Sequence, residues 1–474
     1  MSAAIATLAY GVGILGLLAL DHDRALRTSK ALWIPVVWLF LEASRPVSLW
    51  LQMAPPSSAD TYLEGSPLDR NVFLLLSMAA FVVLFCRRRR VGSFLRNNRA
   101  LLLFFLYCGV SVLWSDYSDV AFRRWIKAVG ELAVVLVVVT DAHPFDALKR
   151  LLSRVGFFVL PLSALFIKYY GDLGRDYRPG GFSGVWNTIY TGVTTDKNAL
   201  GMITMIFGLA ALWQILELRK TTDAPHRRRR TLAQAILLAT ACWLFWITNS
   251  MTSLSCSLAA GVLLVGTNSW AFFRKRAVVH ILVVAFLCLS LGAIFVAPEL
   301  LSIVERDPTL TGRTAIWNLV LDMTGNPLLG TGFESFWLGS RLQRMWSIYW
   351  WHPNEAHNGY LEVFLNLGWV GVALFAAVLV AGYRKILAAV RQREVAGSLM
   401  LAFFVAALIY NITESGIREL NPIWFVFLLA VIAVSRPSVI EGELHADMDE
   451  LEDRVEPEPA FQHFAASDCV REQL

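Results

Sequence analysis

Long apolar runs recur along most of this 474-residue chain and constrain its fold more than any other feature. A helix that crosses the hydrocarbon core of a bilayer needs about 20 mostly apolar residues. The runs are continuous, whereas the strands of a membrane β-barrel alternate apolar and polar residues, so the pattern favours helices. We predict an all-α polytopic integral membrane protein with about 12–13 transmembrane helices. The candidate spans lie at about 2–20, 31–53, 71–86, 101–114, 125–140, 151–168, 199–217, 231–248, 253–270, 278–297, 359–381, 397–412 and 420–435.

The composition excludes several other classes of protein. Hydrophobic residues make up 56% of the chain and charged residues only 17%, which rules out a soluble globular enzyme, a disordered protein and a small disulfide scaffold. Five of the six cysteines lie in apolar runs and no two share a loop, so the sequence predicts neither a disulfide framework nor a thiolate metal site. Basic residues do not gather on one soluble face, so nucleic acid is not an expected partner.

The basic clusters predict an orientation. With thirteen spans, all of them fall on one side of the membrane, which is the cytoplasm by the positive-inside tendency. The N-terminus is then periplasmic and the C-terminus cytoplasmic. The clusters lie at 24–30, 87–99, 149–150, 219–230, 274–276 and 384–393.

Two regions differ from the apolar body. Residues 437–474 carry 11 acidic and 2 basic side chains with no apolar periodicity, and we predict a disordered acidic cytoplasmic tail. Residues 1–436 form the predicted transmembrane domain. Within it, the outer loop 298–358 has 61 residues and contains two stretches with helical spacing, 309–323 and 336–350.

His357 and Arg313 are the candidate catalytic residues of this loop. His357 lies at the outer mouth of the span that begins near residue 359, and a histidine there has an ordinary pKa near working pH, as a general base requires. Arg313 lies at the start of the first loop helix, where a guanidinium and free backbone N–H groups can bind phosphate. An ordinary interfacial histidine and a solvated arginine are the alternatives.

Other outer cations support an anionic ligand, because positive charge outside the cytoplasm goes against the topological bias. We name Arg175, Arg178, Lys197, Arg123 and Arg124 as candidate contacts for a membrane-embedded diphosphate. Trp317, Trp337 and Asn358 are candidate contacts for an attached sugar chain, with the interfacial aromatic belt as the alternative for the tryptophans.

Two further features complete the candidate chemistry. Glu42 and Arg45 interrupt the second span and can pair at i, i+3, so a structural ion pair and a functional role are both open interpretations. No Walker loop, HExxH motif or nucleophile elbow occurs, and we expect a metal-free reaction without a cofactor.

Several sequence blocks resemble the O-antigen ligase and O-antigen polymerase superfamily, in its exopolysaccharide-polymerase-like branch. They are "GRTAIWNLVLDMTGNPLLGTGFESFW" (312–337) followed by "HNGYLEVFLNLGWVG" (357–371), with "SRPVSLW" (44–50), "VLWSDYSDVAFRRWIK" (112–127) and "GVTTDKNALG" (192–201) upstream. The ligase-related region would span about 199–380. The resemblance implies a membrane glycosyltransferase of the C type, in which His357 deprotonates the acceptor hydroxyl and Arg313 holds the diphosphate.

The implied function is inverting, metal-independent glycosyl transfer in the bacterial inner membrane. The donor would be undecaprenyl-diphosphate-linked glycan at the periplasmic face, and the product polymerised exopolysaccharide or O-antigen repeat units. An O-antigen ligase that transfers finished glycan to lipid A-core is the alternative. A lipid-linked oligosaccharide flippase and a non-enzymatic assembly scaffold are alternatives of other classes. Expected partners are the lipid-linked donor, membrane lipids, a glycan or lipid A-core acceptor, and other polysaccharide-assembly proteins.

Overall fold

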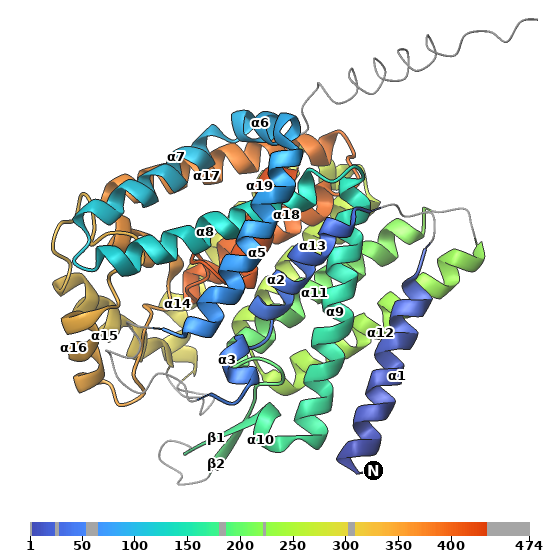
Figure 1. Cartoon of the computed structure of the whole chain (residues 1–474), viewed down its shortest axis with the longest axis horizontal. Helices are drawn as coiled ribbons and strands as arrows, with labels where there is room; N and C mark the ends of the chain where they lie inside the picture. The colour runs from blue at the N-terminus through green and yellow to red at the C-terminus, as the bar shows by residue number, and fades with distance from the viewer. Residues whose placement is uncertain are drawn as a thin grey trace, which may run out of the picture. The chain divides into compact units, whose positions relative to one another are not determined.

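The computed structural model describes residues 2–23, 28–53, 65–179, 186–220, 224–301 and 309–433, and nearly all regular structure in these ranges is helical (Figure 1). This confirms the predicted all-α polytopic membrane protein. Residues Met1–Ser435 form one compact unit. The predicted acidic tail, 437–474, lies outside the described residues.

Every predicted span coincides with a helix or a pair of helices. The α-helices are α1 (Ala3–Asp21), α2 (Trp33–Glu42), α3 (Val47–Trp50), α5 (Pro67–Cys86), α6 (Arg88–Asn97), α7 (Arg99–Val110), α8 (Ser118–Val139), α9 (Pro144–Tyr169), α10 (Gly171–Gly174), α11 (Lys197–Leu218), α12 (Ala224–Thr248), α13 (Met251–Ser269), α14 (Arg276–Leu301), α15 (Thr309–Asp322), α16 (Gly339–Ile348), α17 (Gly359–Arg391), α18 (Gly397–Thr413) and α19 (Pro422–Ala433). Short 3-10 helices lie at Lys30–Leu32, Ser111–Trp114 and Phe272–Arg274.

Fewer than thirteen helices are long enough to cross a membrane alone. Within the described ranges, 7 helices have the necessary length and apolar character, or up to 8 if the pair Arg88–Asn97 and Arg99–Trp114, bent by 92°, is one span. Three further apolar stretches are shorter: Arg276–Gly292 within α14, Gly397–Thr413 (α18) and Pro422–Ala433 (α19). The second predicted span is divided into α2 and α3, because Pro46 cannot continue a helix and restricts the residue before it.

Contacts between the connecting segments gather the predicted outer loops at one end of the unit. Asn198 donates to the Glu414 carboxylate over 3.1 Å, and the Thr252 and Thr413 hydroxyls lie 3.2 Å apart. Arg124 donates to the Glu334 carbonyl. These contacts join loops that are separated by up to 216 positions in the chain.

The predicted cytoplasmic segments are joined to one another in the same way. Arg87 pairs with Asp141 at 3.5 Å, and Lys385 donates to Asn98 at 2.6 Å. Arg230 pairs with Asp23 at 3.1 Å. These contacts join the basic cluster at 384–393 to the one at 87–99, and the cluster at 219–230 to Asp23, beside the cluster at 24–30.

The loop between α9 and α11 contains an element that the apolar pattern did not predict. Strands β1 (Arg175–Pro179) and β2 (Trp186–Tyr190) form an antiparallel hairpin in which Arg175 faces Tyr190 in register (Figure 1). Arg45 holds the two ends of this loop, because its guanidinium donates to the carbonyls of Leu173, Gly192 and Thr194.

The Glu42–Arg45 ion pair that the sequence allows does not form. The Glu42 carboxylate instead accepts a hydrogen bond from the Trp38 indole. The chain leaves the helix directly after Glu42, so the helical i, i+3 spacing does not extend to Arg45.

Helix α17 is broken at Gly368, which has a φ of 63°. The segment 326–332 crosses the helix at this break, where the Gly332 N–H donates to the Asn366 carbonyl over 2.8 Å and the Trp369 N–H donates to the Pro327 carbonyl over 2.9 Å. A Cβ at Gly368 would lie 2.3 Å from the Leu328 carbonyl carbon. Only glycine fits both the positive φ and this close backbone approach.

Candidate active site

His357 lies in the last turn of loop before α17, in a left-handed conformation with a φ of 52°. The next residue, Asn358, is the N-cap of α17, and its side-chain oxygen accepts hydrogen bonds from the N–H groups of Tyr360 and Leu361, each at 3.0 Å. Asn358 is also tied to the segment after α18, because its N–H donates to the Ser415 hydroxyl over 3.1 Å. These hydrogen bonds therefore fix the backbone next to His357, and with it the position from which the imidazole extends.

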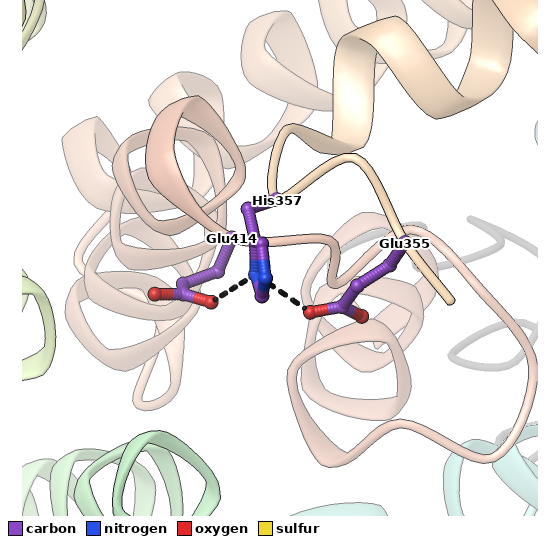
Figure 2. A group of neighbouring side chains, drawn as sticks. All are labelled: Glu355, His357 and Glu414. Atoms are coloured by element: carbon purple, nitrogen blue, oxygen red, sulfur yellow. Dashed lines mark hydrogen bonds and ion pairs between the residues drawn. The ribbon is translucent and has the colours of Figure 1, made fainter. Parts of the chain in front are cut away.

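Two carboxylates flank the imidazole of His357 (Figure 2). Its Nδ1 lies 2.9 Å from Oε1 of Glu355 and 3.3 Å from Oε2 of Glu414. Glu355 belongs to the same loop, whereas Glu414 follows α18. The His357 side chain is 28% exposed and the Glu414 side chain 6%, so the histidine lies at the surface of a partly buried ionic cluster.

Each carboxylate also binds a guanidinium. Arg313, in the second turn of α15, places Nη2 at 3.1 Å from Oε1 of Glu414 and donates through Nη1 to the Thr413 carbonyl. Arg418 places Nη1 at 3.3 Å from Oε2 of Glu355. The result is a continuous row of alternating charges: Arg313, Glu414, His357, Glu355 and Arg418.

These charges determine the protonation state of the imidazole. Burial lowers the pKa of His357, but the hydrogen bonds to Glu355 and Glu414 and the charges of both carboxylates outweigh it and raise that pKa to about 10. Burial opposes ionisation of Glu355, yet the hydrogen bond and charge of His357, with Arg418 and Arg313, hold the pKa of that carboxyl below its ordinary value. At neutral pH the histidine is therefore an imidazolium.

The same three side chains are a possible ligand set for a cation. One donor atom from each of Glu355, His357 and Glu414 lies within 4.8 Å of the others. The two carboxylates already accept from Arg313 and Arg418, however, and the guanidinium groups provide the positive charge that a metal ion would bring. The ion pairs alone account for the geometry.

The beginning of α11 joins this cluster. Asp196 caps the helix by accepting from the N–H groups of Asn198 and Ala199, at 2.8 and 2.9 Å. Asn198 then donates to Oε1 of Glu414, the oxygen that also binds Arg313. Lys197 lies between Asp196 and Asn198 and is exposed, so an unburied cation lies beside the row of charges.

The other predicted diphosphate contacts are more scattered. Arg175 begins β1 and donates to the Ile167 carbonyl over 2.8 Å. Arg123 is exposed on α8, while Arg124 is engaged with the Glu334 carbonyl. Arg178 lies on β1, and its side chain is outside the described set. The hydrogen bonds of Arg175 and Arg124 thus go to backbone carbonyls outside the row of charges.

The predicted glycan contacts all have partners inside the protein. The Trp337 side chain is buried, with the residue 5% exposed, and its indole N–H donates to both oxygens of Glu362 at 2.9 Å. The Trp317 indole donates to the Ala356 carbonyl over 2.8 Å and remains partly exposed. With Asn358 acting as the helix cap, we reinterpret Trp337 and Asn358 as residues that shape the loop around His357.

Sequence reasoning missed the carboxylates of the site. It did not identify Glu414, which joins Arg313, His357 and Asn198. It did not single out Glu355 or Arg418. The sequence does show that charged residues are concentrated in two short outer segments, around Glu355 and around Glu414. This pattern does not indicate which of the charged side chains form pairs.

Comparisons with known proteins agree with the resemblance seen in the sequence. An O-antigen ligase family model matches residues 235–376, a region that includes both Arg313 and His357. Over 324 residues the chain is 24% identical to the exopolysaccharide production protein ExoQ of Rhizobium meliloti (strain 1021). The matched region covers 65% of this chain and 70% of that relative. The predicted relation to this superfamily is confirmed.

Proposed function

Because this chain is a relative of the O-antigen ligase and polymerase superfamily, we propose that it is an inverting glycosyltransferase that uses a lipid-linked glycan. The donor is an undecaprenyl-diphosphate-linked glycan and the reaction takes place at the periplasmic face of the inner membrane. One observation carries the proposal: Arg313 and His357, from two different parts of the chain, contact opposite oxygens of the Glu414 carboxylate. A phosphate-binding cation and a titratable nitrogen therefore lie within one ionic cluster.

In this proposal His357 is the base. Its contacts with protein use Nδ1, which leaves Nε2 as the ring nitrogen for substrate. Nε2 takes the proton of the acceptor hydroxyl while the acceptor oxygen bonds to the anomeric carbon from the face opposite the diphosphate. The bond from that carbon to the diphosphate oxygen breaks, and the electron pair leaves with the diphosphate. Glu355 and Glu414 hold Nδ1 and stabilise the imidazolium that forms, as a carboxylate does in other histidine bases.

Arg313 and Lys197 would stabilise the diphosphate as it leaves. Arg313 presents a guanidinium near the N-terminal end of α15, and Lys197 is exposed in the first turn of α11. A second role for His357 is favoured by its raised pKa: the imidazolium would act as a third cation for the diphosphate instead of as a base. The two roles require opposite protonation states.

Polymerisation of exopolysaccharide or O-antigen repeats is the preferred outcome, because the matched relative is named for exopolysaccharide production. Ligation to lipid A-core differs only in the acceptor.

The test is incubation of the purified protein with a defined undecaprenyl-diphosphate repeat unit, with and without a lipid A-core acceptor. We expect longer lipid-linked glycan without the core acceptor. Transfer only to the core would make the protein a ligase, and no glycosidic bond with either acceptor would reject the proposal. His357→Ala and Arg313→Ala should each abolish product while the folded protein remains in the membrane.

A further inference from the structure

An apolar groove of about 520 Å³ lies between α11, α12 and α13, away from the row of charges. Its walls include Gly208 and Leu212 of α11, Ala241 and Cys242 of α12, and Gly261 of α13. None of the side chains that line it is charged. All three helices are long and apolar enough to cross a membrane, so the groove lies at hydrocarbon depth.

Small residues create the space. A Cβ at Gly261 would meet no atom within 4 Å, and one at Gly208 would meet only the Ala241 Cβ, at 3.4 Å. The groove is open at its side, because Leu258 is 63% exposed and Val262 is 49% exposed. A flexible hydrocarbon chain could therefore enter from the bilayer.

The groove and the candidate active site share two helices. Near the start of α13, the Thr252 hydroxyl contacts Thr413, whose carbonyl accepts from Arg313, and Leu254 already lines the groove two residues later. At the start of α11, Asn198 contacts Glu414, and Gly208 lines the groove ten residues later, about 15 Å along the helix. A headgroup at Arg313 would thus lie near the ends of two of the helices that line the groove.

We propose that this groove holds the isoprenoid chain of the lipid-linked donor. From Thr252 to Val265, α13 rises about 20 Å, roughly two thirds of the hydrocarbon core. A bulk phospholipid would have no reason to follow the two helices that carry the site, whereas a chain attached to a bound diphosphate must begin there. This inference rests on the proposed function, since it names the part of the donor that the charged site does not bind.

The first test fills the groove without touching the charges. In the full-length protein, Gly261→Leu should raise the KM for an undecaprenyl-diphosphate donor at least tenfold and leave the KM for a two-isoprene donor unchanged, with a water-soluble glycan acceptor in both assays. Gly16→Leu is the matched control, because Gly16 also lies in an apolar membrane helix and has open space around its Cβ. An unchanged KM for the long donor in Gly261→Leu would overturn the inference.

The second test needs no catalysis. Cys242 is exposed and lines the groove, so a variant that keeps it as the sole cysteine can be labelled with a membrane-permeant maleimide. Undecaprenyl diphosphate should slow this labelling at concentrations where lipid A and phosphatidylglycerol do not. Equal protection by a phospholipid, or protection by lipid A alone, would reject the donor chain as the occupant. Protection by undecaprenyl diphosphate in a protein that forms no glycosidic bond would retain the groove and reject the proposed reaction.

Discussion

Nδ1 of His357 lies 2.9 Å from Oε1 of Glu355, within the row of charges that ends at Arg313 and Arg418. This contact and the contact with Glu414 raise the pKa of His357 to about 10. The imidazole therefore keeps its second proton throughout the physiological pH range. The protonation of one ring therefore decides between the two roles proposed for it.

The pH dependence of the rate should separate these roles. The pKa of folded His357 lies above its ordinary value, so the imidazole is charged below about pH 10 and becomes neutral as the pH rises through that value. If the neutral ring is the base, kcat/KM should rise about tenfold per pH unit between 7 and 9. A flat profile that falls above pH 10 would assign His357 to the diphosphate instead. Glu355→Gln should move either transition to lower pH, because it removes one of the two flanking charges.

Glu414→Gln should lower kcat by roughly 10²-fold with little loss of folded protein. The change removes the charge that binds both Arg313 and His357 but keeps an oxygen that can accept from Asn198. Asp116→Asn is the matched control, since Asp116 pairs with Arg341 at 3.0 Å and its side chain is 63% exposed. Surface pairs of this kind contribute little, so the control should retain full activity. Equal losses in both variants would contradict a specific role for Glu414.

Arg45→Gln should release the loop between α9 and α11, because three backbone carbonyls lose their charged donor. Hydrogen bonds to charged groups contribute about 1.5–3 kcal/mol each, so we expect a lower melting temperature and a donor KM raised roughly tenfold. Arg45→Lys keeps the charge and should recover part of both. Thermal unfolding and steady-state kinetics measure the two effects, and a normal KM in a destabilised Arg45→Gln protein would limit the role of Arg45 to folding.

Asn358 offers a test of helix capping against glycan binding. Asn358→Ala should cost about 1 kcal/mol, the usual value of an N-cap, and should lower activity by displacing His357. Asn358→Ser keeps a cap-forming oxygen and should restore both stability and activity. A stable but inactive Asn358→Ser variant would show that the amide itself contacts substrate, which is the role predicted from the sequence.

Gly368→Ala should destabilise the protein by several kcal/mol or prevent its accumulation. The added Cβ would meet the Leu328 backbone at 2.3 Å, at a positive φ that alanine rarely adopts. Gly13→Ala is the control, because a Cβ there meets nothing within 4 Å inside a regular helix. The measurement is the folded yield and melting temperature of each variant in detergent, and similar values for the two would contradict the close backbone crossing.

Much of this architecture follows from the sequence alone. Continuous apolar runs predict helices because a bilayer leaves the backbone no other partner, and each predicted run is found on a helix. The loop helices α15 and α16 follow from the helical spacing of their apolar residues. The placement of all basic clusters on one side of the membrane predicted that Arg313 and His357 lie together on the opposite side. These are local or additive properties, so they can be read along the chain.

Only the tertiary structure determines which charged side chains pair with one another in the site. Glu355, Glu414 and Arg418 come from segments up to 63 residues apart, and nothing local indicates that the first two flank the same ring. The sequence allowed Arg45 to pair with Glu42, but α2 ends at Glu42 and the Arg45 guanidinium donates to distant carbonyls instead. The protonation of His357 depends on these long-range contacts, because a pKa responds to charges that are near in space, however far they lie along the chain.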